Sequence, residues 1–448
     1  MCGIAGILGP GASNATVLAQ MGDALARRGP DGQGIWSEGS GKIGLVHRRL
    51  AVLDLTSTGA QPMADVSGRW VISYNGEIYN HRELRQELGG DAAPWRGTSD
   101  TEVLLRAIAR WGVRGSLSRC EGMFAFALWD RKDRVLVLAR DRMGERPLYV
   151  GWIGQDVVFG SELKSLRAHP EWRGGMFEPA VSRFLRFGFV PAPMSIHPGV
   201  FKLPAGSFLR LCEADASGAW DLSEFERRVE RHWSLASAVE AARRDPWKGS
   251  FGEAVDEVRV RLDRAVAARI QADVPVGALL SGGVDSSLVV ESMQRQSMKS
   301  IETFTVGFDD ADFDESQFAF SVAAAIGTKH HVLPMPFMDA ESLLPRVVDV
   351  YDEPFADVAQ LPAMLLCEAV KRQVTVALTG DGGDELFGGY QRYGDCARAW
   401  RWRAMLPASS DGIVRSALSR LSGLDPVTGG RLPARASRSL GRWCSRTQ

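Results

Sequence analysis

The chain has few cysteines and no long apolar run, and both absences narrow its class. Only six cysteines occur in 448 residues, and no two of them form a C-x-x-C pair. A disulfide framework and a zinc site are therefore not predicted, and reduced thiols are expected. The N-terminus has no basic segment followed by an apolar stretch, and no segment is apolar for long enough to span a bilayer. These absences predict a cytoplasmic protein with no membrane partner.

The chain also lacks an excess of positive or of negative charge. The formal net charge is −1, and no long run of like charges occurs, so a nucleic-acid partner is not predicted. Hydrophobic residues make up 45% of the chain and charged residues 24%, which is ordinary globular composition. A length of 448 residues favours two or three domains, each able to bury a core of normal size.

The two halves of the chain have different patterns. In the first, short strand-like runs alternate with turns, which indicates antiparallel sheets, and apolar spacing predicts a helix from Asp100 to Trp111. The runs cover 69–74, 124–129, 134–139 and 156–159. From residue 251 onward strands alternate with helices, which indicates a parallel sheet wrapped by helices. The polar range 211–250 is interpreted as a linker region that is partly structured.

Two glycine-rich turns follow predicted strands of the second half. They are Ser281-Gly282-Gly283-Val284-Asp285-Ser286-Ser287, after a strand at 276–280, and Thr379-Gly380-Asp381-Gly382-Gly383-Asp384-Glu385, after a strand at 374–378. Ligands bind at the carboxyl ends of parallel strands, and a helix N-terminus can hold an anion. The first turn is not a G-x-x-x-x-G-K-[ST] phosphate loop, because the lysine is missing. Both turns are nevertheless candidates for phosphate binding.

Several carboxylates in these turns suggest a cation. Close carboxylates repel one another unless a cation joins them, and Mg²⁺ prefers oxygen ligands together with substrate phosphates. Asp285 and Asp384 are therefore the candidate ligands. The alternative is a solvated acidic loop, which the apolar residues beside both turns disfavour.

The N-terminus carries a candidate nucleophile. If Met1 is removed, the α-amino group of Cys2 can act as the base for its own thiol. Asn75 and Gly76 supply the amide and backbone N–H donors that an oxyanion hole needs, although Asn-Gly is also a common hairpin turn. Arg49 offers a two-point contact for a carboxylate, or is a solvated surface arginine. Asp100 either pairs with an ammonium group or caps its helix, as Ser99 could.

Eight stretches, in this order, resemble the glutaminase domain of class II glutamine amidotransferases, which has the N-terminal-nucleophile hydrolase fold. They are 1–6, 28–32, 47–54, 75–80, 99–102, 122–126, 140–144 and 161–164. The resemblance implies that Cys2 forms a glutamyl thioester and that Asn75 and Gly76 stabilise the oxyanion. It also implies that Arg49 holds the α-carboxylate of glutamine, whereas Glu77 and Asp100 hold its α-ammonium group.

The second half resembles ATP pyrophosphatases, and both turns match the asparagine synthetase family, as do 273–277 and 303–308. The expected fold is an αββα sandwich over 2–210, a linker region over 211–250, and a parallel-sheet α/β domain over 251–448. The resemblance implies an ATP site and an Mg²⁺ site, with Asp381 near the acyl-adenylate and Asp285 and Asp384 on the metal. The residues implied for ATP are Leu280, Ser281, Gly282, Gly283, Asp285, Ser286, Val306, Thr379 and Gly380.

The implied activity is asparagine synthesis from glutamine, aspartate and ATP, with release of AMP and pyrophosphate. A homodimer is compatible with this resemblance. One alternative is a related amidotransferase that acts on another carboxylate, for example in surface polysaccharide synthesis. The resemblance covers Met1 to about Tyr393, and family members usually continue further. A C-terminally short chain with glutaminase activity only, or with a non-catalytic binding role, is therefore the third alternative.

Overall fold

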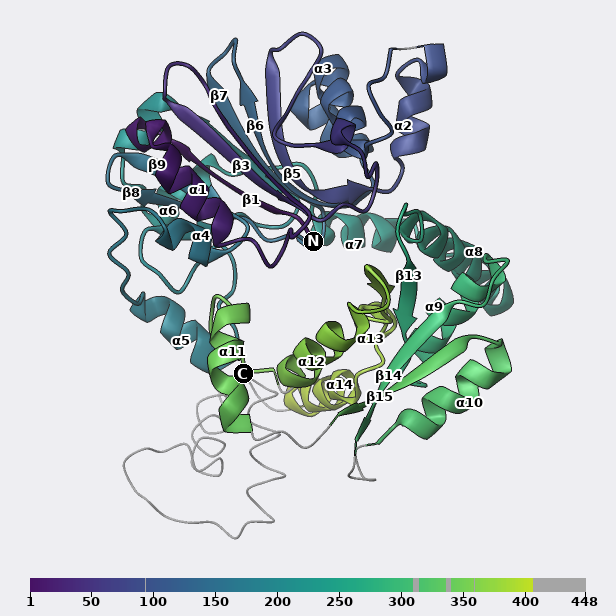
Figure 1. Ribbon diagram of the computed structural model, residues 1–448. Coiled ribbons are helices and arrows are strands. Elements are labelled where there is room, and N and C mark those ends of the chain that lie inside the picture. The colour runs from purple at the N-terminus through teal and green to yellow at the C-terminus, as the bar shows by residue number, and fades with distance from the viewer. Residues whose placement is uncertain (93, 309–313, 336–339, 358, 406–448) are drawn as a thin grey trace, which may run out of the picture.

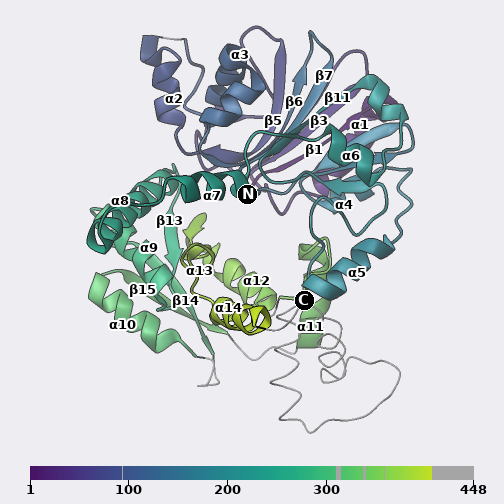
Figure 2. The ribbon, with the colours of Figure 1, turned by 180° about the vertical axis from the view of Figure 1, so that it is seen from behind.

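The computed structural model describes residues 1–448 except 93, 309–313, 336–339, 358 and 406–448. The chain forms two units that face each other, and the N-terminus lies between them in both views (Figures 1 and 2).

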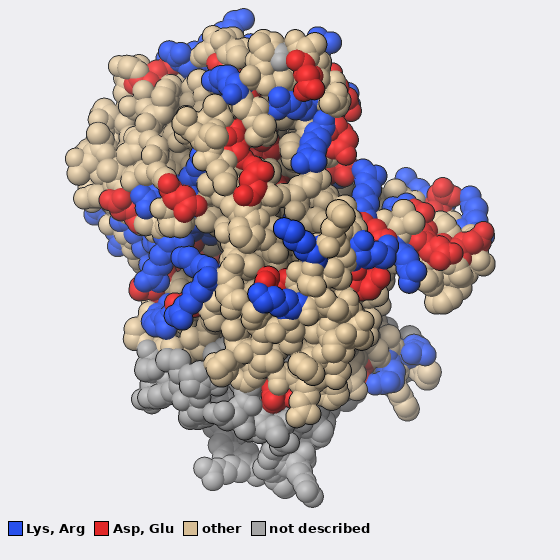
Figure 3. Space-filling model, turned by 45° about the vertical axis from the view of Figure 1, so that its right-hand side comes forward, with Lys and Arg blue, Asp and Glu red and all other residues tan. Residues whose placement is uncertain are grey.

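No helix within the described ranges is long and apolar enough to cross a membrane. None of the cysteines in those ranges forms a disulfide, as predicted; Cys444 lies outside them. Positive and negative side chains are interspersed on the face shown in Figure 3.

The first unit is a sandwich of two six-stranded antiparallel sheets, with the strand orders β10-β8-β9-β1-β3-β2 and β12-β11-β7-β6-β5-β4. The first sheet contains β1 (Gly3–Leu8), β2 (Gly32–Ser37), β3 (Ile43–Arg49), β8 (Tyr149–Ile153), β9 (Asp156–Gly160) and β10 (Val200–Lys202). The second contains β4 (Met63–Ala64), β5 (Trp70–Ile78), β6 (Gly122–Asp130), β7 (Val135–Arg140), β11 (Ser207–Cys212) and β12 (Glu230–Arg231). The antiparallel sheets predicted for the first half are confirmed.

Helices cover both outer faces, which confirms the αββα layering (Figure 1). The first sheet is covered by α1 (Ala15–Asp23) and α4 (Leu163–Arg167), and the second by α2 (His81–Glu87) and α3 (Asp100–Arg119). The predicted helix at 100–111 is thus the first part of α3. It continues past a kink at Gly112, where φ is +70°. Further along the chain, α5 (Glu178–Phe187) leads toward the second unit.

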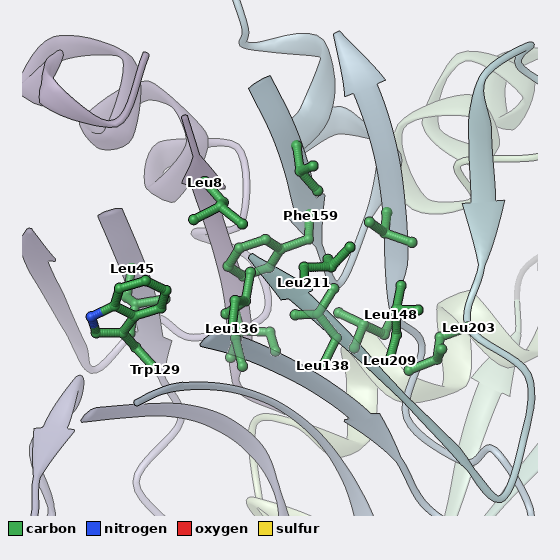
Figure 4. Packing of buried hydrophobic residues seen from close by; sticks show 14 of the residues in the cluster. Leu8, Leu45, Trp129, Leu136, Leu138, Leu148, Phe159, Leu203, Leu209 and Leu211 are labelled. Atoms are coloured by element: carbon green, nitrogen blue, oxygen red, sulfur yellow. The ribbon is translucent and has the colours of Figure 1, made fainter. Parts of the chain in front are cut away.

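The core between the two sheets is formed by alternate residues of facing strands. Leu8 and Leu45 of the first sheet meet Trp129, Leu136 and Leu138 of the second, and all five are fully buried (Figure 4). Side chains along a strand alternate between its two faces. Every residue of β1 is therefore buried: its even-numbered positions face this core, and the odd-numbered ones face α1.

The strand predicted at 69–74 is longer than expected, and the alternative interpretation of Asn75-Gly76 as a hairpin turn is wrong. Both residues lie within β5 and pair with β6, where Gly76 is opposite Phe124. A Cβ atom on Gly76 would lie 2.3 Å from the carbonyl oxygen of Met123. Glycine therefore serves the close approach of two strands here, and not a change of chain direction.

The second unit is a four-stranded parallel sheet with the order β15-β14-β13-β16. Its strands are β13 (Val276–Leu279), β14 (Glu302–Phe308), β15 (Lys329–Met335) and β16 (Val376–Leu378). One face packs on α8 (Phe251–Arg269), α9 (Val284–Arg295) and α10 (Ser316–Ile326), and the other on α12 (Gln360–Val370). The remaining helices are α11 (Ala340–Val350), α13 (Gly383–Phe387) and α14 (Gln391–Ala404). The predicted parallel sheet is confirmed.

The range 211–250 contains regular structure. It holds the end of β11, α6 (Leu222–Arg228), β12 and α7 (Leu235–Arg244). Both strands belong to the sandwich, and Phe225 of α6 is buried in its core. We therefore propose that the first unit extends to about Trp233, and that α7 with residues 245–250 forms the connection.

Contacts among the described residues that join the units include two groups of hydrogen bonds and ion pairs. In one, Glu353 accepts a hydrogen bond of 2.7 Å from the backbone N–H of Ile196 and pairs with Lys202. In the other, Asp273 donates its N–H to the carbonyl oxygen of Val52 at 2.9 Å and accepts the N–H of Asp54 at 2.8 Å. The second group brings the start of the parallel sheet to the N-terminal part of the sandwich.

Candidate functional site

Four of the predicted glutamine-site residues share one face between the two sheets. Ile4, Leu45 and Val71 point into the core between the sheets, so positions of the same parity on β1, β3 and β5 face it too. Gly3 pairs with Arg48, so the next step of this register sets Cys2 beside Arg49. Four residues with this parity lie near the start of β1 and near the ends of β3 and β5: Cys2, Arg49, Asn75 and Glu77.

Cys2 contacts the backbone of Leu50, the residue directly after β3. Its Sγ atom lies 3.4 Å from the N–H nitrogen of Leu50 and 3.5 Å from the Leu50 carbonyl oxygen. Arg28 donates from Nε to the carbonyl oxygen of Cys2 at 2.9 Å. Burial raises the pKa of the Cys2 thiol, and burial lowers the pKa of the Met1 amino group to about 5. The surroundings of Cys2 thus favour the neutral form of the Met1 amine.

Asn75 brings an unused donor to this face. It is only 1% exposed, and its Nδ2 atom has no hydrogen-bond partner among the described residues. A buried N–H group without a partner costs about 1–3 kcal/mol, so proteins rarely keep one unless it has a role. This arrangement fits a donor that is used only when a ligand is present.

The backbone N–H of Gly76 is also directed away from β6. Phe124, its partner in the register, exchanges backbone and carboxylate hydrogen bonds with Asp141 on the opposite side. The N–H groups of Tyr74 and Ile78, two residues to either side of Gly76, donate to side chains outside the sheet. Backbone N–H groups alternate in direction along a strand, so the Gly76 N–H points to the same side as those of Tyr74 and Ile78. On that side the short strand β4 pairs only with residues 71 and 72 of β5.

Glu77 and Asp100 form an acidic pair near Cys2. Burial, together with the charge of Asp100, raises the pKa of Glu77 to about 8, and its Oε1 atom has no partner in the described chain. Burial also raises the pKa of Asp100, which accepts hydrogen bonds from Tyr74 and Ile78. Ser99, and not Asp100, caps α3, with its Oγ accepting from the N–H of Thr101. The Asp100 carboxylate is therefore engaged with β5 and not with the cap of its own helix.

Arg49 is partly buried, and its guanidinium is hydrogen-bonded to the backbone. Its guanidinium donates to the carbonyl oxygens of Thr56 at 2.8 Å, Leu53 at 3.4 Å and Asp54. These contacts use three of the five N–H donors of an arginine and leave others for a carboxylate. A loop, 50–59, therefore sets the position of the Arg49 side chain.

Sequence reasoning assigned no role to Arg146, which lies in this region. Its guanidinium contacts the sulfur atoms of Met1 and Met123, and its Nε atom is buried with no partner in the described residues. Burial lowers its pKa. Asp141 positions the segment, because its carboxylate accepts the N–H groups of residues 143–146. Residues 140–144 were among the matching stretches, and this was the only available signal.

The two glycine-rich turns lie side by side at the carboxyl end of the parallel sheet. They follow β13 and β16, which are neighbours, and the strand order reverses at β13. Such a reversal opens a crevice for ligands in parallel α/β sheets. A Cβ atom on Gly380 would lie 2.6 Å from the backbone nitrogen of Ser286, which shows how closely the turns approach.

Hydroxyl groups organise the first turn at the N-terminus of α9. Ser281 Oγ and Ser286 Oγ are 3.0 Å apart, and Ser287 Oγ donates to the Gly283 carbonyl oxygen at 2.6 Å. Gly282 has φ of +84°, a conformation that favours glycine. The turn thus presents backbone N–H groups at a helix N-terminus, where an anion is stabilised.

The two predicted metal ligands come from these turns. A Cβ atom on Gly383 would lie 2.4 Å from the Asp285 carboxylate carbon, so Asp285 reaches the second turn directly beside Asp384. Among the described residues, no group of three or more acidic, His or Cys side chains could hold a metal alone. Two carboxylates fit Mg²⁺ when phosphate oxygens complete its shell.

The other predicted ATP residues surround the same crevice. Leu280 is buried directly after β13 and donates its N–H to the Phe304 carbonyl oxygen at 2.8 Å. Val306 lies on β14, the other neighbour of β13, and is partly buried. In the second turn, Thr379 Oγ1 donates to the exposed Asp381 carboxylate at 2.9 Å.

Comparison with known proteins divides the chain in the same way. Residues 1–221 match the family model described as a glutamine amidotransferase domain, and residues 257–443 match the asparagine synthase model. The first matched range contains Cys2 and the residues around it, and the second contains both glycine-rich turns.

Several relatives match across most of this chain. The chain is 35% identical over 419 residues to a Methanocaldococcus jannaschii protein assigned as glutamine-hydrolysing asparagine synthetase 2, covering 88% of this chain and 76% of that protein. Asparagine synthetase 1 of Bacillus subtilis is 35% identical over 401 residues, with 88% and 59% covered. A Gibberella zeae protein named Amidase chry2 is 33% identical, with 88% and 60% covered. The chain belongs to the family of glutamine-hydrolysing asparagine synthetases.

Proposed function

We propose that the chain hydrolyses glutamine at Cys2 and uses the ammonia to convert aspartate to asparagine at the expense of ATP, releasing AMP and pyrophosphate. The observation that carries the proposal is the buried, unpartnered Asn75 amide on the same face as Cys2. A structural asparagine would have its Nδ2 paired. A catalytic one needs a free donor for charge that develops only during the reaction.

The first half-reaction follows from the groups on this face. The Cys2 thiol attacks the carboxamide carbon of glutamine, and the α-amino group of Cys2, freed by removal of Met1, takes the thiol proton. Asn75 Nδ2 and the Gly76 N–H stabilise the oxyanion. The amine returns the proton to the departing ammonia, leaving a glutamyl thioester. Water then hydrolyses the thioester to glutamate and regenerates the thiol.

The remaining groups suit the two charged ends of glutamine. Arg49 holds the α-carboxylate with the donors that the 50–59 loop leaves unused. Glu77 and Asp100 hold the α-ammonium group. Burial, and to a smaller extent the charge of Asp100, raises the pKa of Glu77, and a cation bound between the two carboxylates would favour their ionised forms.

The second half-reaction belongs to the crevice between the glycine-rich turns. The pyrophosphate part of ATP is held at the N-terminus of α9 by Ser281, Gly282, Gly283 and Ser286. The rest of the nucleotide is contacted by Leu280, Val306, Thr379 and Gly380. Asp285 and Asp384 would hold Mg²⁺, which neutralises phosphate charge as pyrophosphate leaves. Asp381 contacts the acyl-adenylate. All the substrates are soluble metabolites, so we place the reaction in the cytoplasm.

A second candidate is amidation of another carboxylate by the same chemistry. The match to the protein named Amidase chry2 favours keeping it. The glutaminase residues and the phosphate turns would serve any carboxylate acceptor, so the choice rests on the product.

The test supplies amide-¹⁵N glutamine, ATP and Mg²⁺ with aspartate or with other carboxylic acids, and measures ¹⁵N product, AMP and pyrophosphate. We expect ¹⁵N-asparagine from aspartate. Cys2→Ala should lose glutamine-dependent synthesis and keep synthesis from ammonium. Normal glutamine hydrolysis by Cys2→Ala would refute the site. Hydrolysis without any amide product would leave a glutaminase only, and nucleotide binding without either reaction would leave a binding protein.

A further inference from the structure

The parallel-sheet unit contacts the glutamine pocket through two residues to which the reaction above assigns no part. Arg269 is the last residue of α8, and Asp273 follows four residues later, before β13 begins. Both reach across to the sandwich. Asp273 contacts the loop beside Arg49, and Arg269 contacts the end of the strand that carries Glu77.

Asp273 fixes the loop that surrounds Arg49. Asp54 has φ of +53°, a left-handed conformation that is unfavourable for a residue other than glycine and persists only where contacts enforce it. The Asp273 carboxylate accepts the Asp54 N–H at 2.8 Å, and the Asp273 N–H donates to Val52 at 2.9 Å. These two bonds from the second unit hold the backbone on both sides of Leu53.

The sandwich holds the same loop from its own side. The Asp54 carboxylate accepts hydrogen bonds from the hydroxyls of Thr56 at 2.6 Å and Thr58 at 2.7 Å, and from the N–H of Thr98 at 3.0 Å. With Asp54 fixed at both ends, the loop carbonyls at 53, 54 and 56 all point toward the Arg49 guanidinium. The orientation of Arg49 therefore depends on a bond from the other unit.

Arg269 contacts the end of β5, the strand that carries Glu77. Its guanidinium lies over the ring of Tyr79, 4.5 Å from the ring centre. Tyr79 follows directly after β5 and is two residues from Glu77, so the stacked ring fixes the end of the strand that carries Glu77. The positive charge also acts on Glu77 itself, together with Arg146.

We propose that Asp273 and Arg269 are positioning residues for glutamine binding, so that the synthetase unit completes the glutamine pocket from outside the glutaminase unit. The proposal rests on the proposed function, because it concerns how Arg49 and Glu77 are set for their ligand. Since β13 lies between Asp273 and the first phosphate turn, the segment 273–287 links both sites.

The experiment measures glutamine hydrolysis without ATP by the full chain carrying Asp273→Ala, Asp273→Asn, Arg269→Ala or Arg264→Ala. Arg264 is the matched control: it lies on α8 and pairs with Glu121 across the same interface at 3.6 Å, but both side chains are more than half exposed and neither contacts the pocket. Melting curves check folding, and calorimetric binding of glutamine to each variant in a Cys2→Ala background gives affinity without turnover.

We expect Asp273→Ala to raise the KM for glutamine about tenfold, with kcat within about twofold, as loss of one hydrogen bond to a charged acceptor does. Asp273→Asn should stay near the parent value, because its amide oxygen still accepts the Asp54 N–H. Arg269→Ala should also raise the KM, and Arg264→Ala should not. The proposal fails if Asp273→Ala and Arg269→Ala both behave as Arg264→Ala, or if binding is unchanged. Absence of hydrolysis in the parent chain, by contrast, counts against the proposed function.

Discussion

Replacement of Asn75 separates a catalytic donor from a structural one. In the ligand-free protein Asn75 Nδ2 is buried without a partner in the described chain, so Asn75→Ala breaks no hydrogen bond made by that atom. Removing an unsatisfied donor relieves a cost of about 1–3 kcal/mol, which offsets the packing lost with the amide. We therefore expect a melting temperature that does not fall. By contrast, kcat for glutamine hydrolysis should fall roughly 10²–10³-fold, equivalent to about 3–4 kcal/mol of transition-state stabilisation.

Asn80 is the matched control, because both polar atoms of its amide are hydrogen-bonded. Its Nδ2 donates to the Arg119 carbonyl oxygen at 2.9 Å, and its Oδ1 accepts the Glu121 N–H at 2.9 Å. Asn80→Ala should lower the melting temperature, since two hydrogen bonds of about 1 kcal/mol each are lost, and leave kcat within about twofold.

The assay combines steady-state release of glutamate with melting curves for the parent, Asn75→Ala and Asn80→Ala. The KM for glutamine should change little in Asn75→Ala, because the donor acts on charge absent from the ground state. A kcat of parental size in Asn75→Ala would refute the oxyanion assignment. A loss of stability equal to that of Asn80→Ala would instead show that Asn75 is a structural residue.

Glutamine binding should improve as pH rises toward 8, since burial raises the pKa of Glu77 to about 8 and only its ionised form attracts an ammonium group. The free energy of unfolding should fall as pH rises from about 4.5 to 8, because the unfolded chain releases the Glu77 proton in this range while the folded protein keeps it. In Glu77→Gln, both the KM slope and this loss of stability should disappear. Arg49→Lys should raise the KM for glutamine about tenfold, because lysine lacks the two-point contact; an unaltered KM in a folded variant would exclude it. Asp285→Asn and Asp384→Asn should each abolish Mg²⁺-dependent pyrophosphate release while glutaminase activity persists; normal Mg²⁺ dependence in either would contradict the shared metal site.

The sequence alone determined the chemistry that depends on short, ordered motifs. Cys2 after a removable methionine, and glycine-rich turns after apolar strands, can be recognised without coordinates, because each needs only a local backbone conformation and a few residue types. The division into an antiparallel first half and a parallel second half was also local information, since it follows from apolar periodicity.

The way in which these pieces meet depends on tertiary contacts. A hairpin turn at Asn75-Gly76 was consistent with local preference, but pairing with β6 extends the strand and directs Asn75 toward the face shared with Cys2. The adjacency of β13 and β16, which joins the two phosphate turns, and the bond from Asp273 to Asp54 depend on residues far apart in the chain. Such pairings are selected by the combined burial of many side chains, and no single stretch of sequence records that sum.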